Sequence, residues 1–462
     1  MRIVYSLFLC GFFMLASCAP KGESSLMLDW KSNDSGKILL EDNRFILESG
    51  QTATYNGRGS GRGYSDFEIS GFIALSPGSV VTLMFHTDKT GKGYELVFHN
   101  GPVNGTLKTG SLTGVRNLYK SVSKDGDWTS FILAVIDKHI SLYVDGIEVA
   151  SYIEPENPYR TGEFTDRLLG RGNFVLSCKE GPAKFQDFNL NLFPRDHEAR
   201  VNALTMPVID EQSDRIIRMQ QAMFPVIDYH VHLKGMDRKE VQAKSLSYGI
   251  EYGIAPNCGI GFPITNDDQV RDFVIENYNA PFLLGMQGEG REWVTTFSQQ
   301  SRNLFNYVFT DAMTFTDHKN RRTRLWMDEE VFIDIPQEQY MDIIVDKIVK
   351  VLDEEPIDVY VNPTFLPTAM EADYDKLWTD ARIDRVVKAL KANNIALEIN
   401  ARYRIPNFKV IKAAKDAGIR FTFGTNNGDA DMGKLEYCME AVDACGLTAA
   451  DMWFPSYRTI RR

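Results

Sequence analysis

The sequence predicts a multidomain protein in which an all-β sandwich of the jelly-roll type precedes an α/β barrel of seven or eight strands. Two patterns indicate this organisation. Short alternating strands separated by Gly, Asn and Asp fill the first part of the chain, whereas buried strands and amphipathic helices alternate in the second. A chain of 462 residues is long enough for two or three domains. We expect the sandwich over residues 26–195, a helical linker over 196–223 and the barrel over 224–462.

The composition is that of a globular protein, with 44% hydrophobic and 24% charged residues. The formal net charge is −11, and no basic block interrupts the sequence. A partner with a phosphate backbone requires clustered positive charge, so we expect no nucleic-acid partner.

The amino terminus reads as a targeting segment rather than part of the fold. Arg2 precedes an apolar run from Val4 to Leu15, which is too short for an ordinary membrane-spanning helix. The sequence Leu15-Ala-Ser-Cys18 resembles a bacterial lipoprotein signal, which implies removal of residues 1–17, lipid on Cys18 and a polar tether over 18–25. Several acyl chains anchor a protein stably. We therefore expect an exported lipoprotein on the periplasmic face or the cell surface.

Cys10 leaves with the signal and Cys18 carries the lipid, which leaves four cysteines for the folded domains. Their spacing shows no C-x-x-C pair of the zinc-binding kind. We expect isolated buried thiols, although an exported location permits a disulfide. These cysteines are Cys178, Cys258, Cys438 and Cys445.

The sandwich is predicted from short runs in which apolar and polar residues alternate. Asp145-Gly146 is a strong hairpin signal between two of them. Several short strands at this spacing indicate two packed antiparallel sheets. The expected strands are 66–70, 80–85, 93–98, 129–135, 139–144, 173–177 and 183–190.

The order of these segments resembles the 3-keto-disaccharide hydrolase family, a concanavalin-like jelly roll. The matching pieces are Gly93-Tyr-Glu95, Asp127-Trp-Thr129, the hairpin 141–146 and the closing strands 172–177 and 181–188. The resemblance implies cleavage of 3-keto-glycosides, with an oligosaccharide or glycoside as partner. These motifs specify the fold better than an activity, so this domain is either catalytic or only carbohydrate-binding.

Glu95 is our candidate catalytic residue in the sandwich, and four further residues are candidates for a sugar-facing site. The alternative for Glu95 is a solvated position on the outer face of a strand, and His99 beside Asn100-Gly101 suits a turn cap. The other three candidates are His86, Arg116 and Tyr119.

The barrel is predicted from strands and helices that alternate along the second half of the chain. Residues 451–454 are a weak candidate for an eighth strand. The expected strands are 226–230, 252–256, 282–286, 307–311, 358–362, 396–400 and 420–424. The expected helices are 238–247, 267–278, 298–304, 337–354, 374–392, 407–417 and 432–445.

The first barrel strand ends in Asp228-Tyr-His-Val-His232. Residues two apart on a strand point to the same side, so His230 and His232 are expected to converge. Two imidazoles in this arrangement suit a divalent metal ion such as zinc, manganese or iron. The alternative is a pair of hydrogen-bonded surface histidines.

Polar residues follow the barrel strands in succession, at the face where barrel enzymes place their sites. Asn257, Gln287 and Asn400 are among them. We predict Glu398, Glu289 and Asp311 as catalytic residues, and Glu289 and Asp311 also as metal ligands beside His230 and His232. The predicted substrate-binding residues are Arg291, Arg322, Arg324, Asn362, Arg402, Arg404, Asn426 and Asn427. Ion pairing on the rim is the alternative for the arginines.

The loop 312–334 is long enough to be a lid over this face. It contains Trp326 and His318. His318 is either a proton shuttle that reaches the site or a solvated loop residue.

Three segments of the barrel resemble the polymerase-and-histidinol-phosphatase superfamily, a seven-stranded metal-dependent barrel related to the amidohydrolases. They are 228–232, 397–400 and 423–427. The last strand of that family usually ends Gly-Ser-Asp-Ala-His, whereas this one ends Gly424-Thr-Asn-Asn-Gly428, and Asn362 stands at a position where the family has His. The resemblance therefore implies one or two metal ions rather than three.

The leading hypothesis is a membrane-anchored hydrolase or lyase of carbohydrate catabolism that cleaves glycosides by metal-assisted acid/base chemistry in the barrel. One alternative is a phosphoesterase of the barrel superfamily. Another is a surface carbohydrate-binding lipoprotein without catalysis. Replacing His230 and His232 by Ala separates them, because an enzyme loses turnover whereas a binding protein keeps its affinity.

Overall fold

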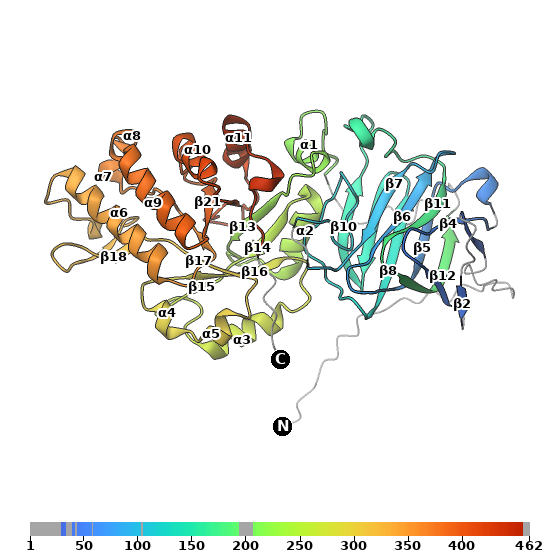
Figure 1. The fold of residues 1–462 in the computed structure, drawn as a ribbon, viewed down its shortest axis with the longest axis horizontal. Coiled ribbons are helices and arrows are strands. Elements are labelled where there is room, and N and C mark those ends of the chain that lie inside the picture. Colours follow the sequence, from blue (N-terminus) through green and yellow to red (C-terminus); the bar gives the residue numbers. More distant parts are fainter. Residues whose placement is uncertain are drawn as a thin grey trace, which may run out of the picture.

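The computed structural model describes residues 29–33, 39–41, 44–57, 59–102, 105–193 and 207–455. The predicted signal peptide, the tether and Cys18 lie outside these residues. The chain forms two domains that lie side by side along the longest axis of the molecule (Figure 1). The strands of the first domain lie between Trp30 and Leu192, and those of the second between Ile227 and Gly424.

The first domain is a sandwich of two antiparallel sheets, as predicted. All seven expected strands are present, and β1 to β4 and β10 are additional. One sheet has the order β1 (Trp30–Ser32), β4 (Thr52–Tyr55), β11 (Asn173–Glu180), β6 (Val80–Thr87) and β7 (Tyr94–Phe98). The other has the order β10 (Ile147–Ile153), β9 (His139–Val144), β8 (Trp128–Ile136), β5 (Phe67–Leu75), β12 (Ala183–Leu192), β3 (Arg44–Leu47) and β2 (Leu39–Glu41).

Alternating side chains of the two sheets form the core of the sandwich. Along β5, Phe67, Ile69 and Ile73 are buried while Glu68, Ser70 and Phe72 face outwards. Phe45 stacks on Phe185 with their ring centroids 4.6 Å apart. Burying each such side chain stabilises the fold by about 1.5–3 kcal/mol, so this pattern fixes which face of each strand points inwards.

The second domain is a closed barrel of parallel strands. The order is β14 (Glu251–Ile254), β13 (Ile227–Val231), β22 (Phe421–Gly424), β21 (Ala396–Asn400), β20 (Val359–Tyr360), β17 (Tyr307–Thr310), β16 (Leu283–Gly288) and β15 (Asn257–Cys258). The additional pairing of β14 with β16 closes the barrel. Because β14 and β15 are successive pieces along the same neighbour, β16, the barrel has seven strand positions.

The weak candidate for an eighth strand, 451–454, is wrong. The described part of this segment contains the end of a 3-10 helix (Ala449–Asp451) and one parallel bridge between Phe421 and Met452. A capping box between Thr448 and Asp451 stabilises the helical turn, and this local pairing prevents a strand from starting there.

Helices cover the outside of the barrel (Figure 1). They are α2 (Arg238–Tyr248), α3 (Asp267–Glu276), α4 (Trp293–Thr296), α5 (Gln299–Arg302), α6 (Gln337–Glu354), α7 (Thr368–Glu371), α8 (Tyr374–Leu377), α9 (Asp380–Ala392), α10 (Phe408–Asp416) and α11 (Glu436–Cys445). The predicted helix 374–392 is two helices, because the Thr379 side chain accepts the N–H of Arg382 and starts α9 afresh. The loop after β17 carries the hairpin β18 (Thr314–Thr316) and β19 (Arg322–Arg324).

The interior of the barrel is packed with aromatic side chains rather than open. Tyr229, Tyr307 and Phe309 form a buried cluster, and Trp453 packs against it. The Tyr307 hydroxyl donates to the carbonyl oxygen of Tyr229, 2.5 Å away. The polar residues at the strand ends therefore lie above a packed aromatic core.

A loop of the sandwich closes the amino-terminal end of the barrel. The Glu251 carboxylate, at the start of β14, accepts the backbone N–H groups of Tyr119 (2.8 Å) and Lys120 (3.2 Å). The Lys120 ammonium group donates to the carbonyl oxygens of Ala280 (2.8 Å) and Phe282. The two domains thus share partly buried hydrogen bonds at the end of the barrel opposite the carboxyl ends of its strands.

The short helix α1 (Arg215–Gln221) belongs to both domains and lies between them (Figure 1). Ile216 packs in the core of the barrel, and its neighbour Ile217 packs in the core of the sandwich. The Gln220 side chain accepts the N–H of Asn117 (2.7 Å) and donates to the carbonyl oxygen of Gly249 (2.9 Å). Of the predicted helical linker 196–223, the described residues before Arg215 are not helical.

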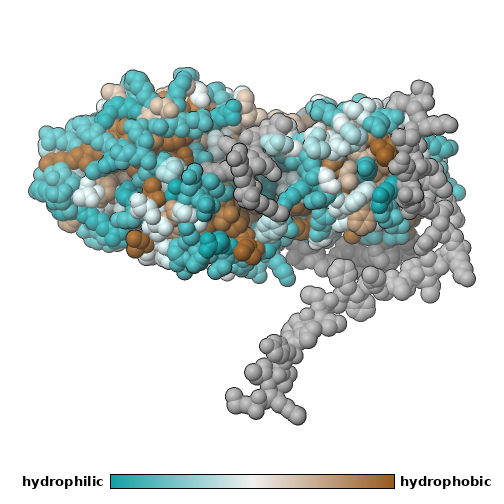
Figure 2. Space-filling model, turned by 60° about the horizontal axis from the view of Figure 1, so that its bottom comes forward, coloured by the Kyte–Doolittle hydropathy of each residue, from teal (hydrophilic) through white to brown (hydrophobic). Residues whose placement is uncertain are grey.

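No helix among the described residues is both long and apolar enough to cross a membrane. In the view of Figure 2, the coloured surface is mostly hydrophilic and the hydrophobic side chains gather in small patches. The four predicted isolated thiols are confirmed, since Cys178, Cys258, Cys438 and Cys445 are free and buried.

Candidate functional site

A single hydrogen-bonded network joins the polar side chains at the carboxyl end of the barrel strands, and Asn362 is its centre. The backbone N–H of Asn362 donates to Glu398 Oε2 (2.7 Å), and its side-chain amide donates to Asp311 Oδ2 (3.0 Å). Its Oδ1 accepts from the amides of Asn400 (2.9 Å) and Asn426 (2.8 Å). Four strand ends are thus held at one point.

The network continues through His230 to the other side of the barrel. His230 Nδ1 lies 2.5 Å from Glu398 Oε1, and its Nε2 lies 3.1 Å from Gln287 Oε1. The Gln287 amide donates to Glu289 Oε1 (3.0 Å), which also accepts from Asn257 (2.5 Å). The structure therefore brings the predicted residues His230, Glu289, Asp311, Glu398, Asn362 and Asn426 into one site.

The network has a buried layer and an upper layer. Glu398 and His230 are 1% exposed, and Asn400 is fully buried. Glu289 and Asp311 are each 8% exposed. A carboxylate at this depth fits a role in positioning other groups, as for Glu398, whereas Glu289 and Asp311 lie slightly nearer the surface.

Gly424, the last residue of β22, makes room for the buried layer. A Cβ atom at this position would lie 2.1 Å from Glu398 Oε1 and 2.8 Å from the Cβ of His230. Any other residue would displace one of these side chains. The glycine of the sequence Phe423-Gly-Thr-Asn-Asn427 is therefore part of the site.

Asp228, which is fully buried, anchors the last strand to the first. Its Oδ1 accepts the backbone N–H groups of Thr425 (2.9 Å) and His230 (3.3 Å), and its Oδ2 accepts the Thr425 hydroxyl. Burial raises the pKa of Asp228. The motif Asp228-Tyr-His-Val-His232 thus contains a structural carboxyl group as well as its two imidazoles.

The two histidines of this motif are in opposite electrostatic situations. Burial opposes the charge of His230, but the Glu398 carboxylate outweighs burial and raises the pKa of His230 above its ordinary value. Burial and the neighbouring His230 lower the pKa of His232 to about 3. The lowered pKa keeps His232 neutral at neutral pH, whereas the raised pKa of His230 favours its charged form.

Glu289 is the carboxyl group whose pKa is raised in the upper layer. Burial is the main cause, and the nearby charge of Asp311 adds to it. A carboxyl group with a raised pKa can hold a proton that it then donates. Glu289 is suited to donate a proton near neutral pH, whereas Asp311 accepts hydrogen bonds from Asn362 and from the N–H of Met313 (3.0 Å).

The predicted metal ligands are only partly assembled. His232 Nδ1 lies 2.9 Å from the carbonyl oxygen of Ala255, and the Asn426 side chain also forms a hydrogen bond with this imidazole. His230 Nε2 faces Gln287 Oε1, so a metal ion there requires the Gln287 amide to turn away. Within the described residues no three His, Cys, Asp or Glu side chains gather as a metal-binding group. As they lie, these side chains do not fit a metal ion with three protein ligands.

Four residues other than glycine adopt left-handed backbone conformations around this network. Their φ angles are +47° for Asn362, +62° for Thr364, +53° for Arg404 and +46° for Asn426. A β-branched residue such as Thr364 avoids this region, and each such residue costs about 1–3 kcal/mol. Strain of this kind is retained where it sets the direction of functional groups, and here it directs the loops after β20, β21 and β22.

Two of the predicted substrate-binding arginines lie beside the network. The Arg402 guanidinium donates to the carbonyl oxygen of Asn426 (3.2 Å) and stacks on Tyr403. Arg291 donates to the carbonyl oxygen of Asp311 (2.8 Å) and forms an ion pair with Glu355 (2.9 Å). Arg402 is exposed and free to reach a substrate, whereas Arg291 supports the backbone of the site from below.

The structure does not bring the other predicted arginines into the network. Arg404 forms an ion pair with Glu440 on α11 (2.6 Å). Arg324 forms an ion pair with Glu330 inside the loop 312–334, and Arg322 is exposed on the same hairpin. The rim ion pairs that were the alternative for the arginines are therefore present for Arg404 and Arg324.

Asn427 and His318 have structural partners. Asn427 Oδ1 accepts the N–H of His232 (2.7 Å), and its amide donates to the carbonyl oxygen of His232 (2.8 Å). His318 lies 2.9 Å from Asp334, which also binds Lys319 (2.5 Å). Trp326, in the same loop, is 40% exposed.

Three residues of the network were predicted to lie at strand ends, but the sequence assigned them no role. Gln287 connects His230 to Glu289, Asn257 holds Glu289, and Asn400 connects Asn362 to Glu398, to which it donates at 3.0 Å. A side-chain amide of Asn or Gln does not define a recognisable sequence motif. The signal that identifies these residues is their position, each at or beside the carboxyl end of a barrel strand.

The candidate residues of the sandwich do not form one site. Glu95 forms an ion pair with Lys179 (3.1 Å) and lies 3.9 Å from Arg167. His86 Nε2 and His99 Nδ1 are each bonded to a backbone carbonyl oxygen, of Ser65 and Ser79 respectively. Arg116 and Tyr119 lie at the contact with the barrel. The Glu95 side chain is 13% exposed, so a ligand can approach it.

Comparison with known proteins identifies the first domain. Residues 24–191 match the model of a family described as a 3-keto-alpha-glucoside-1,2-lyase-like domain. The resemblance predicted for the sandwich is therefore confirmed for this region. The resemblance of the barrel to the polymerase-and-histidinol-phosphatase superfamily stays a prediction. No curated protein matches the chain.

Two solved structures are each similar to about a third of this chain. A candidate glycosyl hydrolase from Parabacteroides distasonis shares 14% identity over 36% of this chain and 89% of its own, with a TM-score of 0.30. A carbohydrate-binding module from Bacillus subtilis shares 15% identity over 35% of this chain and 95% of its own, with a TM-score of 0.25.

Proposed function

We propose that the protein is an exported, membrane-anchored lipoprotein of carbohydrate catabolism that cleaves glycosides, and 3-keto-glycosides in particular, at the carboxyl end of the barrel. The observation that carries the catalytic part is the continuous network from Glu289 through His230 and Glu398 to Asp311. The family match of residues 24–191 supports the substrate class.

The proposed reaction starts with removal of a proton. A ketone acidifies the C–H of the carbon beside it, so a base can take this proton while the electron pair forms a carbon–carbon double bond and the glycosidic C–O bond breaks. Asp311 is the proposed base, since it is held by two N–H donors at the upper layer. Glu289 is the proposed acid, which gives its proton to the leaving oxygen.

Addition of water completes the cleavage. Water adds across the double bond, with its oxygen bonding to the anomeric carbon. Glu289, now ionised, takes a proton from this water, and Asp311 returns its proton to the neighbouring carbon. Both carboxyl groups regain their initial states, and the sum of the two steps is hydrolysis of the glycoside.

The remaining residues of the network position these groups. The His230–Glu398 pair holds Gln287 and Asn362, which in turn hold Glu289 and Asp311. We propose that Arg402 and Asn426 bind hydroxyl groups of the sugar, because Arg402 presents a planar set of donors at the rim. Glu95, on the sandwich, is a separate candidate for sugar binding.

A divalent metal ion, zinc, manganese or iron, at His230 and His232 stays a prediction, and neither step above requires it. Elemental mass spectrometry of the mature chain tests it directly. One or two equivalents that disappear when both histidines are replaced by Ala would support a metal-assisted reaction, and turnover with and without chelator then gives its contribution.

The proposed function is tested by turnover of 3-keto-glycosides. We expect the double variant His230→Ala/His232→Ala to lose at least about 100-fold in kcat/KM, because the His230–Glu398 pair holds the proposed acid and base in place and their catalysis contributes about 10²–10⁴-fold. The variant His318→Ala, which replaces a histidine outside the network, is the matched control and keeps its activity. Thermal unfolding shows whether the double variant is folded. A folded double variant with unchanged turnover contradicts the proposal. If the wild type shows no turnover and the double variant binds the sugar as tightly as the wild type, a binding protein is favoured.

A further inference from the structure

A pocket of the sandwich holds a carboxylate that comes from outside the sandwich. We call residues 207–213, which precede α1, the strap. Its residues Val208, Asp210, Gln212 and Ser213 are exposed, whereas Glu211 is only 2% exposed. The strap therefore runs over the surface and inserts one side chain.

Every hydrogen bond to the Glu211 carboxylate comes from a residue of the sandwich. Its Oε1 accepts the Tyr152 hydroxyl (2.5 Å), and its Oε2 accepts the backbone N–H of Tyr159 (2.8 Å) and Nη1 of Arg160 (2.7 Å). The side chains of Arg160 and Glu211 are 3% and 2% exposed. A buried charge is tolerated only with such complete pairing.

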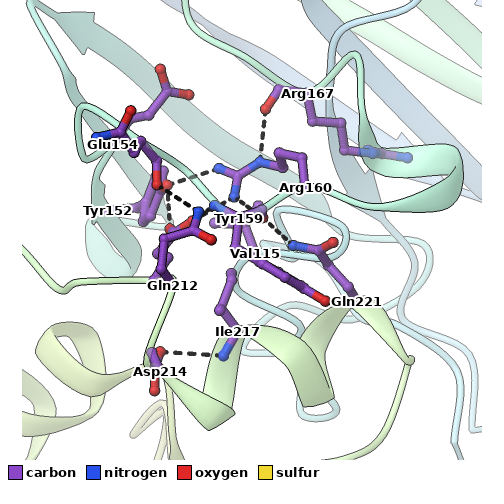
Figure 3. Close-up of polar contacts among 12 residues, drawn as sticks. Val115, Tyr152, Glu154, Tyr159, Arg160, Arg167, Gln212, Asp214, Ile217 and Gln221 are labelled. Atoms are coloured by element: carbon purple, nitrogen blue, oxygen red, sulfur yellow. Dashed lines mark hydrogen bonds and ion pairs between the residues drawn. The ribbon is translucent and has the colours of Figure 1, made fainter.

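The sandwich fixes the Arg160 guanidinium without help from the strap, as Figure 3 shows for its contacts with neighbouring loops. Its Nε donates to the carbonyl oxygen of Arg167 (2.9 Å), and its Nη1 donates to that of Tyr159 (2.7 Å). Its Nη2 donates to the hydroxyls of Tyr94 (2.9 Å) and Tyr152 (2.8 Å). A guanidinium has five N–H groups, so four are held by the sandwich and the fifth points at Glu211.

We propose that this pocket is a carboxylate-binding site of the sandwich, that Glu211 is its internal ligand, and that a carboxylate-bearing sugar, a uronate, occupies it when the strap leaves. The donors that meet Glu211 are a guanidinium, a hydroxyl and an N–H, which together recognise a carboxylate rather than a neutral group. Because the residues on either side of Glu211 are exposed, removing the strap opens the pocket to solvent. The choice of a sugar rests on the proposed function, whereas the choice of a carboxylate does not.

The strap competes with any external ligand, because it is tethered to the pocket. A tethered group acts at an effective concentration on the order of millimolar or more. An external carboxylate therefore binds the wild-type protein weakly, and removal of the Glu211 side chain should reveal the affinity of the pocket.

Binding to the mature full-length chain tests the proposal. Acetate, glucuronate and glucose are titrated by calorimetry into the wild type, into Glu211→Ala and into the double variant Glu211→Ala/Arg160→Met. We expect acetate and glucuronate to bind Glu211→Ala at least about tenfold more tightly than the wild type, and glucose to bind neither. The double variant should lose this gain, because the charged donor is gone.

The possible outcomes separate the two parts of the proposal. Equal carboxylate affinity in the wild type and Glu211→Ala, or an unchanged gain in the double variant, overturns the pocket. Binding of acetate without glucuronate overturns the sugar as ligand. If Glu211→Ala does not fold, its refolding yield is compared in acetate and in chloride of equal ionic strength, where recovery in acetate supports the pocket and no recovery overturns it. Acetate binding does not depend on glycoside cleavage, so a failure of the proposed function leaves this test intact.

Discussion

The two ends of the barrel use buried polar groups in different ways. At the amino-terminal end, Glu251 and Lys120 bind backbone groups of the opposite domain and close the barrel. At the carboxyl-terminal end, Glu289 and Asp311 lie close enough for one charge to raise the pKa of the other carboxyl group. The hydrogen-bonded partners at the amino-terminal end stabilise the fold. At the carboxyl-terminal end, the two neighbouring carboxyl groups raise a pKa, which is typical of functional sites.

The largest effect is expected from breaking the carboxyl-terminal end at its proposed base. Asp311→Asn should lower kcat by about 10²–10⁴-fold with little change in thermal stability, because the amide keeps the size of the side chain but cannot take a proton. Turnover of a 3-keto-glycoside measures the loss. Arg404→Ala removes a nearby charge that faces Glu440 instead, and it should keep full activity. Equal activity of Asp311→Asn and the wild type would remove Asp311 from the mechanism.

The next largest effect is expected where the buried layer of the network is packed. Gly424→Ala should lower the free energy of unfolding by about 1–3 kcal/mol and reduce activity as well, because its Cβ would overlap Glu398. Denaturant unfolding and turnover are measured on the same variant. Gly170→Ala is the matched control, since a Cβ there meets nothing within 4 Å. Full stability of Gly424→Ala would show that Glu398 can move without cost.

The amino-terminal end should respond in stability alone. Lys120→Met removes the donor for two carbonyl oxygens and the positive charge beside Glu251, which should cost about 3 kcal/mol. Activity per folded molecule should not change. Lys124→Met, which removes an exposed lysine of the same region, serves as control and should cost less than about 1 kcal/mol. A loss of turnover in folded Lys120→Met would mean that the two ends are coupled.

The last expected effect is a pH dependence at the same end. Burial raises the pKa of Glu251 to about 7 from its ordinary value of 4.5. Between these two values the folded state holds the proton and the unfolded state does not, so the contribution of Glu251 to stability falls as pH rises from about 4.5 to 7 and is constant above. The free energy of unfolding of the wild type relative to Glu251→Gln should therefore fall by about 1–3 kcal/mol over this range. A difference that is independent of pH contradicts the raised pKa.

Much of the fold followed from local sequence patterns. The alternation of strands and helices gave all seven barrel strand positions, and the helix Gln337–Glu354 has the predicted bounds because its apolar residues recur at helical spacing. The segment 374–392 was harder to predict, since the break before α9 depends on one capping side chain, Thr379. The contact between the domains depends on pairings such as Glu251 with the N–H of Lys120, which no local pattern contains.

The candidate site was predictable in position and less so in function. Strand-end positions identified Glu289, Asp311, Asn362 and Glu398, because parallel strands deliver their carboxyl ends to one face. Which of these side chains a substrate can reach depends on how deeply each is buried. Burial is determined by neighbours such as Gly424, which has no functional side chain. The separation of buried Glu398 from the upper layer therefore required the three-dimensional structure.

The helix α1 has a practical consequence for dividing the molecule. Ile216 and Ile217 are adjacent in sequence, yet each completes a different hydrophobic core. A fragment of either domain that lacks this helix loses one side chain of its own hydrophobic core. A fragment that includes the helix exposes the apolar side chain that packs in the core of the other domain. Neither domain has a clean boundary at this helix, and evolutionary exchange of one domain requires a matching change in the helix.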